Sequence, residues 1–148
     1  MDLTLEIRVE KGCEDLPLPS YRTPGAAGMD LHAAVAGEEM LRPGEWKRIS
    51  CGIAIALPPG YEAQVRPRSG LALEHGVTLL NSPGTIDSDY RGTLGVVLIN
   101  HSQRPFVIRR GDRVAQLVVG PVARVTWNGV SVLPDSERGS GGFGHTGK

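Results

Sequence analysis

Short alternations of apolar and polar residues, separated by turn signals, run through most of this chain. Apolar residues occupy every second position from Leu3 to Val9, which predicts a strand with one buried face. Further apolar runs predict strands over 46–50, 53–57, 61–65, 106–108 and 114–119. Turn signals containing Pro or Gly lie between them, at 42–45, 58–60 and 111–112. Many short strands joined by tight turns predict an all-β fold, either a barrel or a sandwich.

Other segments depart from this strand pattern. Residues 69–76 predict one short helix, which Ser69 is expected to cap and Gly76 to end. Residues 122–133 are expected to be extended, and Asn128-Gly129 within them could form either a hairpin turn or a bulge. The glycine-rich residues 135–148 have little to bury except Phe143. We therefore expect one β domain over 1–134 and a flexible tail over 135–148.

The stretch from Asn81 to Gly95 is expected to be the bend of a long hairpin. Apolar runs that read as strands precede it and follow it. A simple surface turn would need Gly, Pro and one Asp, but this bend also carries Asp87, Asp89, Tyr90 and Arg91. The stretch is therefore either a solvated hairpin tip or a stiff support that presents catalytic groups.

Composition narrows the class of protein. The chain has 148 residues, of which 40% are hydrophobic and 22% charged, so a single globular domain is expected. The formal net charge of +0 argues against a nucleic-acid partner, and no apolar run is long enough to span a membrane. The start of the chain lacks the pattern of a signal peptide, so a cytoplasmic location is expected. Cys13 and Cys51 are expected to be reduced, with one of them buried.

Several groups along the chain suit an anion. Arg66, Arg68 and Ser69 stand where a predicted strand enters the helix, and backbone N–H groups there favour a phosphate, although simple helix capping would explain them as well. Gln116 lies within an apolar strand, either facing outward or contacting a ligand. Arg138 and the glycine tail add a further anion contact. Asp87 is a candidate for activating water, and the four histidines lack metal-ligand spacing. Arginines, backbone amides and one carboxylate indicate hydrolysis of a phosphoryl ester.

Five motifs in order resemble those of the trimeric dUTP diphosphatase (dUTPase) family, and the resemblance spans nearly the whole chain. They are Ala27-Gly-Met-Asp-Leu-His-Ala33, Arg66-Pro-Arg-Ser-Gly-Leu-Ala72, Gly84-Thr-Ile-Asp-Ser-Asp-Tyr-Arg-Gly92, Arg110-Gly-Asp-Arg-Val-Ala-Gln-Leu117 and Arg138-Gly-Ser-Gly-Gly-Phe-Gly144. Gly95 is a small departure, because relatives often have a larger side chain there. Each motif alone is weak, but the five in this order are highly specific.

The resemblance implies a jelly-roll-like β-barrel subunit, a homotrimer, and active sites built from several chains. It implies hydrolysis of dUTP to dUMP and pyrophosphate, which keeps uracil out of DNA and supplies dUMP for thymidylate synthesis. It also implies Mg²⁺ bound through the substrate phosphates and water, with no metal ligands from the protein.

The same resemblance assigns roles to individual residues. Asp87 would hold the attacking water, and Asn81 with hairpin backbone, including Gly95, would read the uracil edge. Tyr90 would pack against the deoxyribose, and Asp30 would support the site near the sugar and hairpin. The tail would close over the site, with Arg138 on the terminal phosphate and Phe143 stacked on the base. The expected substrate contacts are Arg68, Ser69, Gly70, Asn81, Thr85, Ile86, Asp87, Tyr90, Gly95, Gln116, Arg138 and Phe143.

Two alternatives belong to other function classes. A dCTP deaminase resembles this family in fold, and a non-catalytic nucleotide-binding module would share the phosphate contacts. The Asp87 hairpin and the Phe143 tail favour the hydrolase over the deaminase, and the intact Asp87 disfavours a module without activity.

Overall fold

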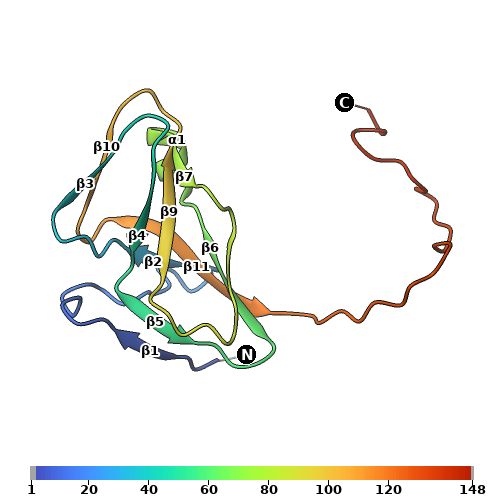
Figure 1. Cartoon of the computed structure of the whole chain (residues 1–148), viewed down its shortest axis with the longest axis horizontal. Coiled ribbons are helices and arrows are strands. Elements are labelled where there is room, and N and C mark those ends of the chain that lie inside the picture. Colours follow the sequence, from blue (N-terminus) through green and yellow to red (C-terminus); the bar gives the residue numbers. More distant parts are fainter. Residues whose placement is uncertain (1–2, 148) are drawn as a thin grey trace.

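The computed structural model describes residues 3–147 and is mostly β with one short helix. A four-stranded antiparallel sheet has the strand order β2-β11-β6-β8, and a three-stranded sheet has the order β4-β9-β7. Two further pairs, β1-β5 and β10-β3, complete the body (Figure 1). In chain order the elements are β1 (Glu6–Val9), β2 (Met29–His32), β3 (Glu38–Leu41), β4 (Trp46–Ser50), β5 (Ile53–Ala56), β6 (Tyr61–Arg66), α1 (Ser69–His75), β7 (Val77–Leu79), β8 (Gly84–Ile86), β9 (Gly95–Asn100), β10 (Phe106–Arg109) and β11 (Arg113–Pro121).

The core forms where the inward faces of these small sheets meet. Its fully buried side chains come from strands far apart in the sequence, among them Leu31, Leu98 and Ile108. Alternation along each strand explains which side chains are buried, because every second side chain points to the same face of a sheet. The described strands form separate sheets and short pairs rather than a closed barrel.

Most of the predicted elements are confirmed. The strands over 46–50, 53–57, 61–65, 106–108 and 114–119 are all present, and their observed ends differ by at most two residues. The turns are present as well, since the amides of Glu45, Tyr61 and Asp112 bond back to carbonyls three residues earlier. Cys13 and Cys51 are free thiols, and Cys51 is buried.

The structure corrects some expectations and adds two strands. Gly76 ends α1 in the left-handed conformation as expected, but the N-cap is Arg68, with no side-chain cap from Ser69. The strands β2 and β3 were not predicted, because charged residues interrupt their apolar pattern: β2 reads Met-Asp-Leu-His and β3 reads Glu-Glu-Met-Leu. Residues 122–133 form no strand, so Asn128-Gly129 is neither a hairpin turn nor a bulge.

The central hairpin is also more complex than a single bend. β7 and β9 pair as predicted, with Leu79 opposite Leu98. Between them, however, β8 leaves this sheet and pairs with β6, so that Gly84 lies opposite Val65. The stretch from Asn81 to Gly95 therefore bridges two sheets, which fixes its position in the body.

Residues 122–147 leave the body as an exposed arm. β11 ends at Pro121, and the arm extends away from the sheets to the C-terminal end (Figure 1). Its apolar side chains are exposed rather than packed: Val122, Val125, Trp127, Val130, Val132, Leu133 and Phe143. The expected start of a separate tail at residue 135 stays a prediction, and Met1, Asp2 and Lys148 lie outside the described residues.

Candidate active site

Three arginines converge on the carboxylate of Asp30. Asp30 Oδ1 accepts a hydrogen bond from Arg68 Nε at 3.1 Å. Asp30 Oδ2 accepts bonds from Arg22 Nε and from Arg113 Nη1, both at 3.3 Å. We refer to Asp30, Arg22, Arg68 and Arg113 as the arginine cluster. The side chain of Asp30 is only 13% exposed, so this carboxylate is largely enclosed.

The cluster carries excess positive charge. Burial opposes ionisation of Asp30, but hydrogen bonds from Arg113 and Arg22 and the charge of Arg68 outweigh it, so the pKa of the carboxyl is lowered. One carboxylate then faces three guanidinium groups. The net charge of about two positive units suits a polyanion such as a phosphate chain.

The sheet brings these residues together. Gln116 on β11 lies opposite Asp30 of β2 on one side and Arg66 of β6 on the other. Gln116 Nε2 donates to the carbonyl of Pro67 at 3.0 Å. A Cβ at Gly28 would lie 2.5 Å from Gln116 Oε1, so only glycine allows this approach. The first, second and fourth motifs therefore meet at one end of β6.

Two predicted phosphate contacts stand beside this end. Ser69 and Gly70 open α1 directly after Arg68, and both are exposed. Their exposure leaves both residues accessible to a ligand in the single chain.

A buried histidine adjoins the cluster. His32 lies two residues after Asp30 on β2, on the same face, and is only 7% exposed. Burial lowers its pKa although the nearby charge of Asp30 opposes the shift, so we expect the ring to be neutral at pH 7. His32 Nδ1 is buried without a hydrogen-bond partner among the described residues.

The Asp87 hairpin differs sharply from this cluster. Asp87 is exposed, and its carboxylate makes no hydrogen bond or ion pair within residues 3–147. The backbone around it is ordered, since the amide of Tyr90 bonds to the carbonyl of Asp87 at 3.1 Å. Tyr90 Oη donates to the carbonyl of Thr93 at 3.2 Å. A Cβ at Gly92 would lie 2.4 Å from Tyr90 Oη, so glycine is needed beneath this ring.

The other hairpin residues line the same region. Asn81 and Thr85 are exposed, whereas Ile86 is buried at 8% exposure. A Cβ at Gly95 would lie 2.8 Å from Nε of Arg48, and Arg48 Nη2 donates to the carbonyl of Thr93 at 3.2 Å. Arg48 thus lies against the part of the backbone that is predicted to read the base.

The hairpin and the arginine cluster lie at opposite ends of β6. Val65 pairs with Gly84 and Ala63 with Ile86, so Asp87 continues toward Glu62 and away from Arg66. Four residues of strand span roughly 13 Å. Within one chain, Asp87 therefore stands well apart from the arginine cluster.

The tail residues touch neither half of the site. Arg138 Nε donates to the carbonyl of Gly141 at 2.7 Å, which is a contact within the tail itself. Phe143 is fully exposed and has a positive φ of 50°. One chain therefore presents three separate groups of predicted site residues: the cluster, the hairpin and the tail.

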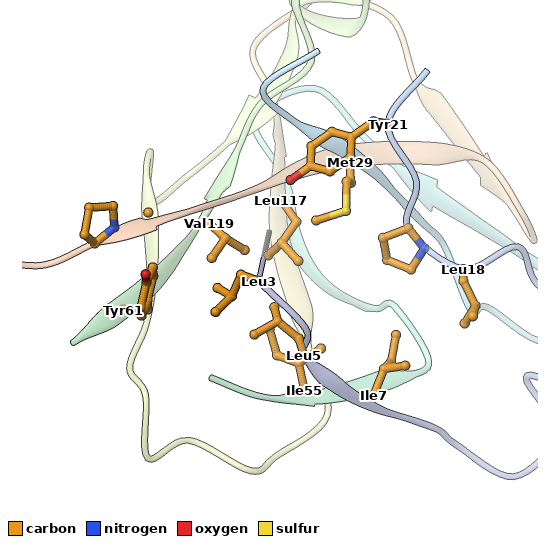
Figure 2. Close-up of a pocket in the computed structure, with 13 residues that line it drawn as sticks. Leu3, Leu5, Ile7, Leu18, Tyr21, Met29, Ile55, Tyr61, Leu117 and Val119 are labelled. Carbon is orange, nitrogen blue, oxygen red and sulfur yellow. The ribbon is translucent and has the colours of Figure 1, made fainter. Parts of the chain in front are cut away.

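A groove on the body is unsuited to a triphosphate. It has a volume of about 690 Å³ and a mostly apolar lining, to which Tyr21 and Tyr61 also contribute (Figure 2). Side chains from β1, β5 and β11, such as Ile7, Ile55 and Leu117, point into it. No arginine or lysine lines it. We refer to this hollow as the apolar groove.

Sequence reasoning missed part of the site. Within one chain Asp30 contacts arginines rather than hairpin residues, so its expected place near the hairpin is not met there. Arg22 and Arg48 lie outside the five motifs, and no local pattern distinguishes them from surface arginines. His32 could have been found, because it follows Asp30 at the strand period of two.

Comparison with known proteins decides the family. The sequence model of the dUTPase family matches residues 14–147. The chain belongs to the dUTPase family. The match spans the arginine cluster, the hairpin and the tail, so all three groups of site residues lie within the family's own pattern.

Relatives agree over nearly the full length. The deoxyuridine 5′-triphosphate nucleotidohydrolase of Maricaulis maris is 57% identical over 136 residues, which cover 90% of each chain. The enzyme of the same name from Caldanaerobacter subterraneus subsp. tengcongensis is 53% identical over 147 residues, which cover 99% of each. The dUTPase resemblance inferred from the five motifs is confirmed, and this family member hydrolyses dUTP.

Solved structures support the same fold. The dUTPase of Staphylococcus bacteriophage 80alpha, determined with dUpNHpp, superposes with a TM-score of 0.87 at 25% identity, covering 98% of this chain and 99% of that chain. A mutant dUTPase from phage phi11 of S. aureus has a TM-score of 0.77 at 24% identity and covers 88% of this chain and 98% of that chain. The latter structure is described as revealing the coordination of a structural Mg(II) ion.

Proposed function

We propose that this dUTPase cleaves dUTP between the α- and β-phosphates at sites shared by the copies of a homotrimer. The products are dUMP and pyrophosphate. The observation that carries the proposal is the separation of Asp87 from the arginine cluster along β6. This separation supports a site in which the hairpin of one copy faces the arginine cluster of another.

Asp87 is the proposed base. Its carboxylate is exposed and makes no bond within the described residues, so both oxygens are free to hold a water. The water oxygen attacks the α-phosphorus and its proton passes to Asp87, while the bond from the α-phosphorus to the bridging oxygen breaks. The pyrophosphate leaves with that oxygen. Asp30 cannot take this role, because three arginines occupy its oxygens.

The phosphate chain binds at the other half. Arg68, Ser69, Gly70 and Gln116 are gathered at one end of β6 and the start of α1. Their guanidinium, hydroxyl, amide and backbone N–H groups can all donate to phosphate oxygens. Arg138 from a tail adds a contact to the terminal phosphate, where the negative charge is greatest.

The nucleoside binds along the hairpin. Backbone groups at Thr85, Ile86 and Gly95, with the side chain of Asn81, read the uracil edge. Tyr90 packs on the deoxyribose and leaves no room for a 2′-hydroxyl. Phe143 from a tail stacks on the base, which covers an aromatic ring that is otherwise fully exposed.

The proposed site suits an Mg²⁺ ion that is bound by the substrate and by water. Residues 3–147 contain no group of three or more His, Cys, Asp or Glu that could hold a metal ion. Oxygen ligands from the triphosphate and water suit Mg²⁺, which keeps several waters when it binds. When bound, the ion would neutralise part of the phosphate charge.

The exposed arm supports the trimer. Six apolar side chains of residues 122–133 stand in solvent, and the apolar groove begins where this arm leaves the body, at Gly120 and Pro121. Burying the arm on the groove of another copy would remove both apolar surfaces from water. The same contact would let the arm extend a sheet of the other copy, toward the jelly-roll-like barrel that the family resemblance implies.

The test of this function is a comparison of products across nucleotides. Pyrophosphate release from dUTP should far exceed release from dTTP, dCTP and UTP, because the site discriminates by hydrogen bonds and by the space at C2′. Pyrophosphate and phosphate are measured separately, which identifies the bond that breaks. Comparable turnover of dCTP, release of ammonia, or release of single phosphates would contradict the proposal.

A further inference from the structure

Arg22 joins the arginine cluster from outside every motif. It lies in the proline-rich loop before β2, and its Nε donates to Asp30 Oδ2 at 3.3 Å. Arg113 donates to the same oxygen at the same distance. Two guanidinium groups therefore share one carboxylate oxygen, and neither is fully neutralised by it.

The remaining donors of Arg22 are free. Its side chain is 58% exposed, and its two Nη groups make no hydrogen bond within residues 3–147. Arg68, in contrast, is 25% exposed and uses Nη1 on the carbonyl of Arg113. Arg113 is 46% exposed, so Arg22 is the most exposed arginine of the cluster, and both of its Nη groups remain available to a ligand.

The position of the cluster decides which phosphates it can bind. Under the proposed function the α-phosphate stands beside Asp87, which another copy supplies. The cluster then faces the β- and γ-phosphates, which leave as pyrophosphate. A guanidinium with two free Nη groups can bind two non-bridging oxygens of such a phosphate while its Nε stays on Asp30.

We propose that Arg22 is a further substrate-binding residue of the dUTP site, specific for the phosphates beyond the α-phosphate. This inference rests on the proposed function. It predicts a dependence on the number of phosphates, whereas a surface ion pair that only ties the loop to β2 would contribute little and would not distinguish ligands.

The experiment measures the affinities of dUMP, dUDP and dUpNHpp, each with Mg²⁺, by titration calorimetry on the full chain. Arg22→Ala should weaken dUpNHpp binding by about fivefold to tenfold, as expected for loss of one charge-assisted contact. Binding of dUMP should change by less than about twofold. Arg22→Lys should restore part of the loss, and high salt should reduce the difference.

Arg109→Ala is the matched control. Arg109 forms an exposed ion pair with Glu38 at 2.7 Å between β10 and β3, outside the site. Its removal should leave all three affinities unchanged. The KM for dUTP should rise in Arg22→Ala and not in Arg109→Ala.

Other results would contradict either the role of Arg22 or the proposed function. If Arg22→Ala weakens dUMP and dUpNHpp equally, Arg22 acts through the fold of the site and the inference is wrong. If Arg22→Ala matches Arg109→Ala for every ligand, Arg22 does not touch the substrate. Failure of the unaltered chain to release pyrophosphate from dUTP would instead refute the proposed function, and the ligand series measures Arg22 separately from that assay.

Discussion

Two aspartates of this chain, Asp30 and Asp87, lie in opposite surroundings. Asp30 is 13% exposed and its oxygens accept bonds from three arginines, which come from a loop, a strand and the residue that precedes α1. Asp87 stands on the hairpin, exposed and without a bond within the described residues. Both are carboxylates near the same sheet, yet only their surroundings determine what each can do.

The two surroundings suit two different tasks, phosphate binding near Asp30 and proton transfer at Asp87. A carboxylate whose lone pairs are occupied and whose pKa is lowered stays ionised and organises the cations around it. A carboxylate with free oxygens can accept a proton from water. We infer that the Asp30 region recognises phosphate and the Asp87 region performs hydrolysis, and the experiments below test that division.

Asp87→Asn should have the largest effect. The change keeps the size of the side chain but removes the base, so turnover of dUTP should fall by about a hundredfold or more. Binding of dUpNHpp should persist, because the arginine cluster is untouched. Steady-state rates and calorimetry measure the two quantities separately. The control is Glu14→Gln, an exposed carboxyl change in the loop before β2. Near-normal turnover in Asp87→Asn would show that Asp87 is not the base.

Mixing two inactive variants should restore an intermediate activity. One carries Asp87→Asn with an intact tail, and the other ends before Arg138 with an intact hairpin. If hairpin and tail of one site come from different copies, then equal amounts unfolded and refolded together should give about a quarter of the sites both working parts. Each parent refolded alone is the control. Activity that stays at the parental level although subunits exchange would mean that one chain supplies both parts.

The smallest expected effect is a pH dependence of folding stability that arises from the Asp30 region. The pKa of His32 is lowered in the folded chain, so below its unfolded value of about 6.5 the unfolded state binds a proton that the folded state does not. Stability should therefore fall as pH drops from 7.5 to 5.5. Asp30, with its pKa lowered, contributes stability that is lost only in more acidic solution, as pH falls through its folded pKa.

Thermal melting of His32→Gln isolates that contribution. The substitution should reduce the difference in melting temperature between pH 7.5 and 5.5 by about 2–4 °C. His101→Gln is the control, because His101 is exposed. An unchanged difference in His32→Gln would assign the pH dependence to other groups.

Most of the local structure, and the family, could be predicted from the sequence. Alternating apolar residues are sufficient to specify strands, and Pro and Gly specify turns, because both depend on neighbours within a few residues. The five motifs identified a dUTPase, and the relatives confirm it. The strands β2 and β3 were missed because charged residues interrupt their apolar pattern.

The grouping of the site residues, in contrast, depends on the three-dimensional fold. Asp30 meets Arg68 across 38 residues and Arg113 across 83, through the pairing of β2 with β11 and of β11 with β6. The pairing of β8 with β6 places Asp87 away from the arginine cluster. The motif that contains Asp87 is nevertheless as clear in the sequence as the other four motifs. A local pattern cannot contain this information, because strand order and register depend on long-range hydrogen bonds and on burial of the whole core.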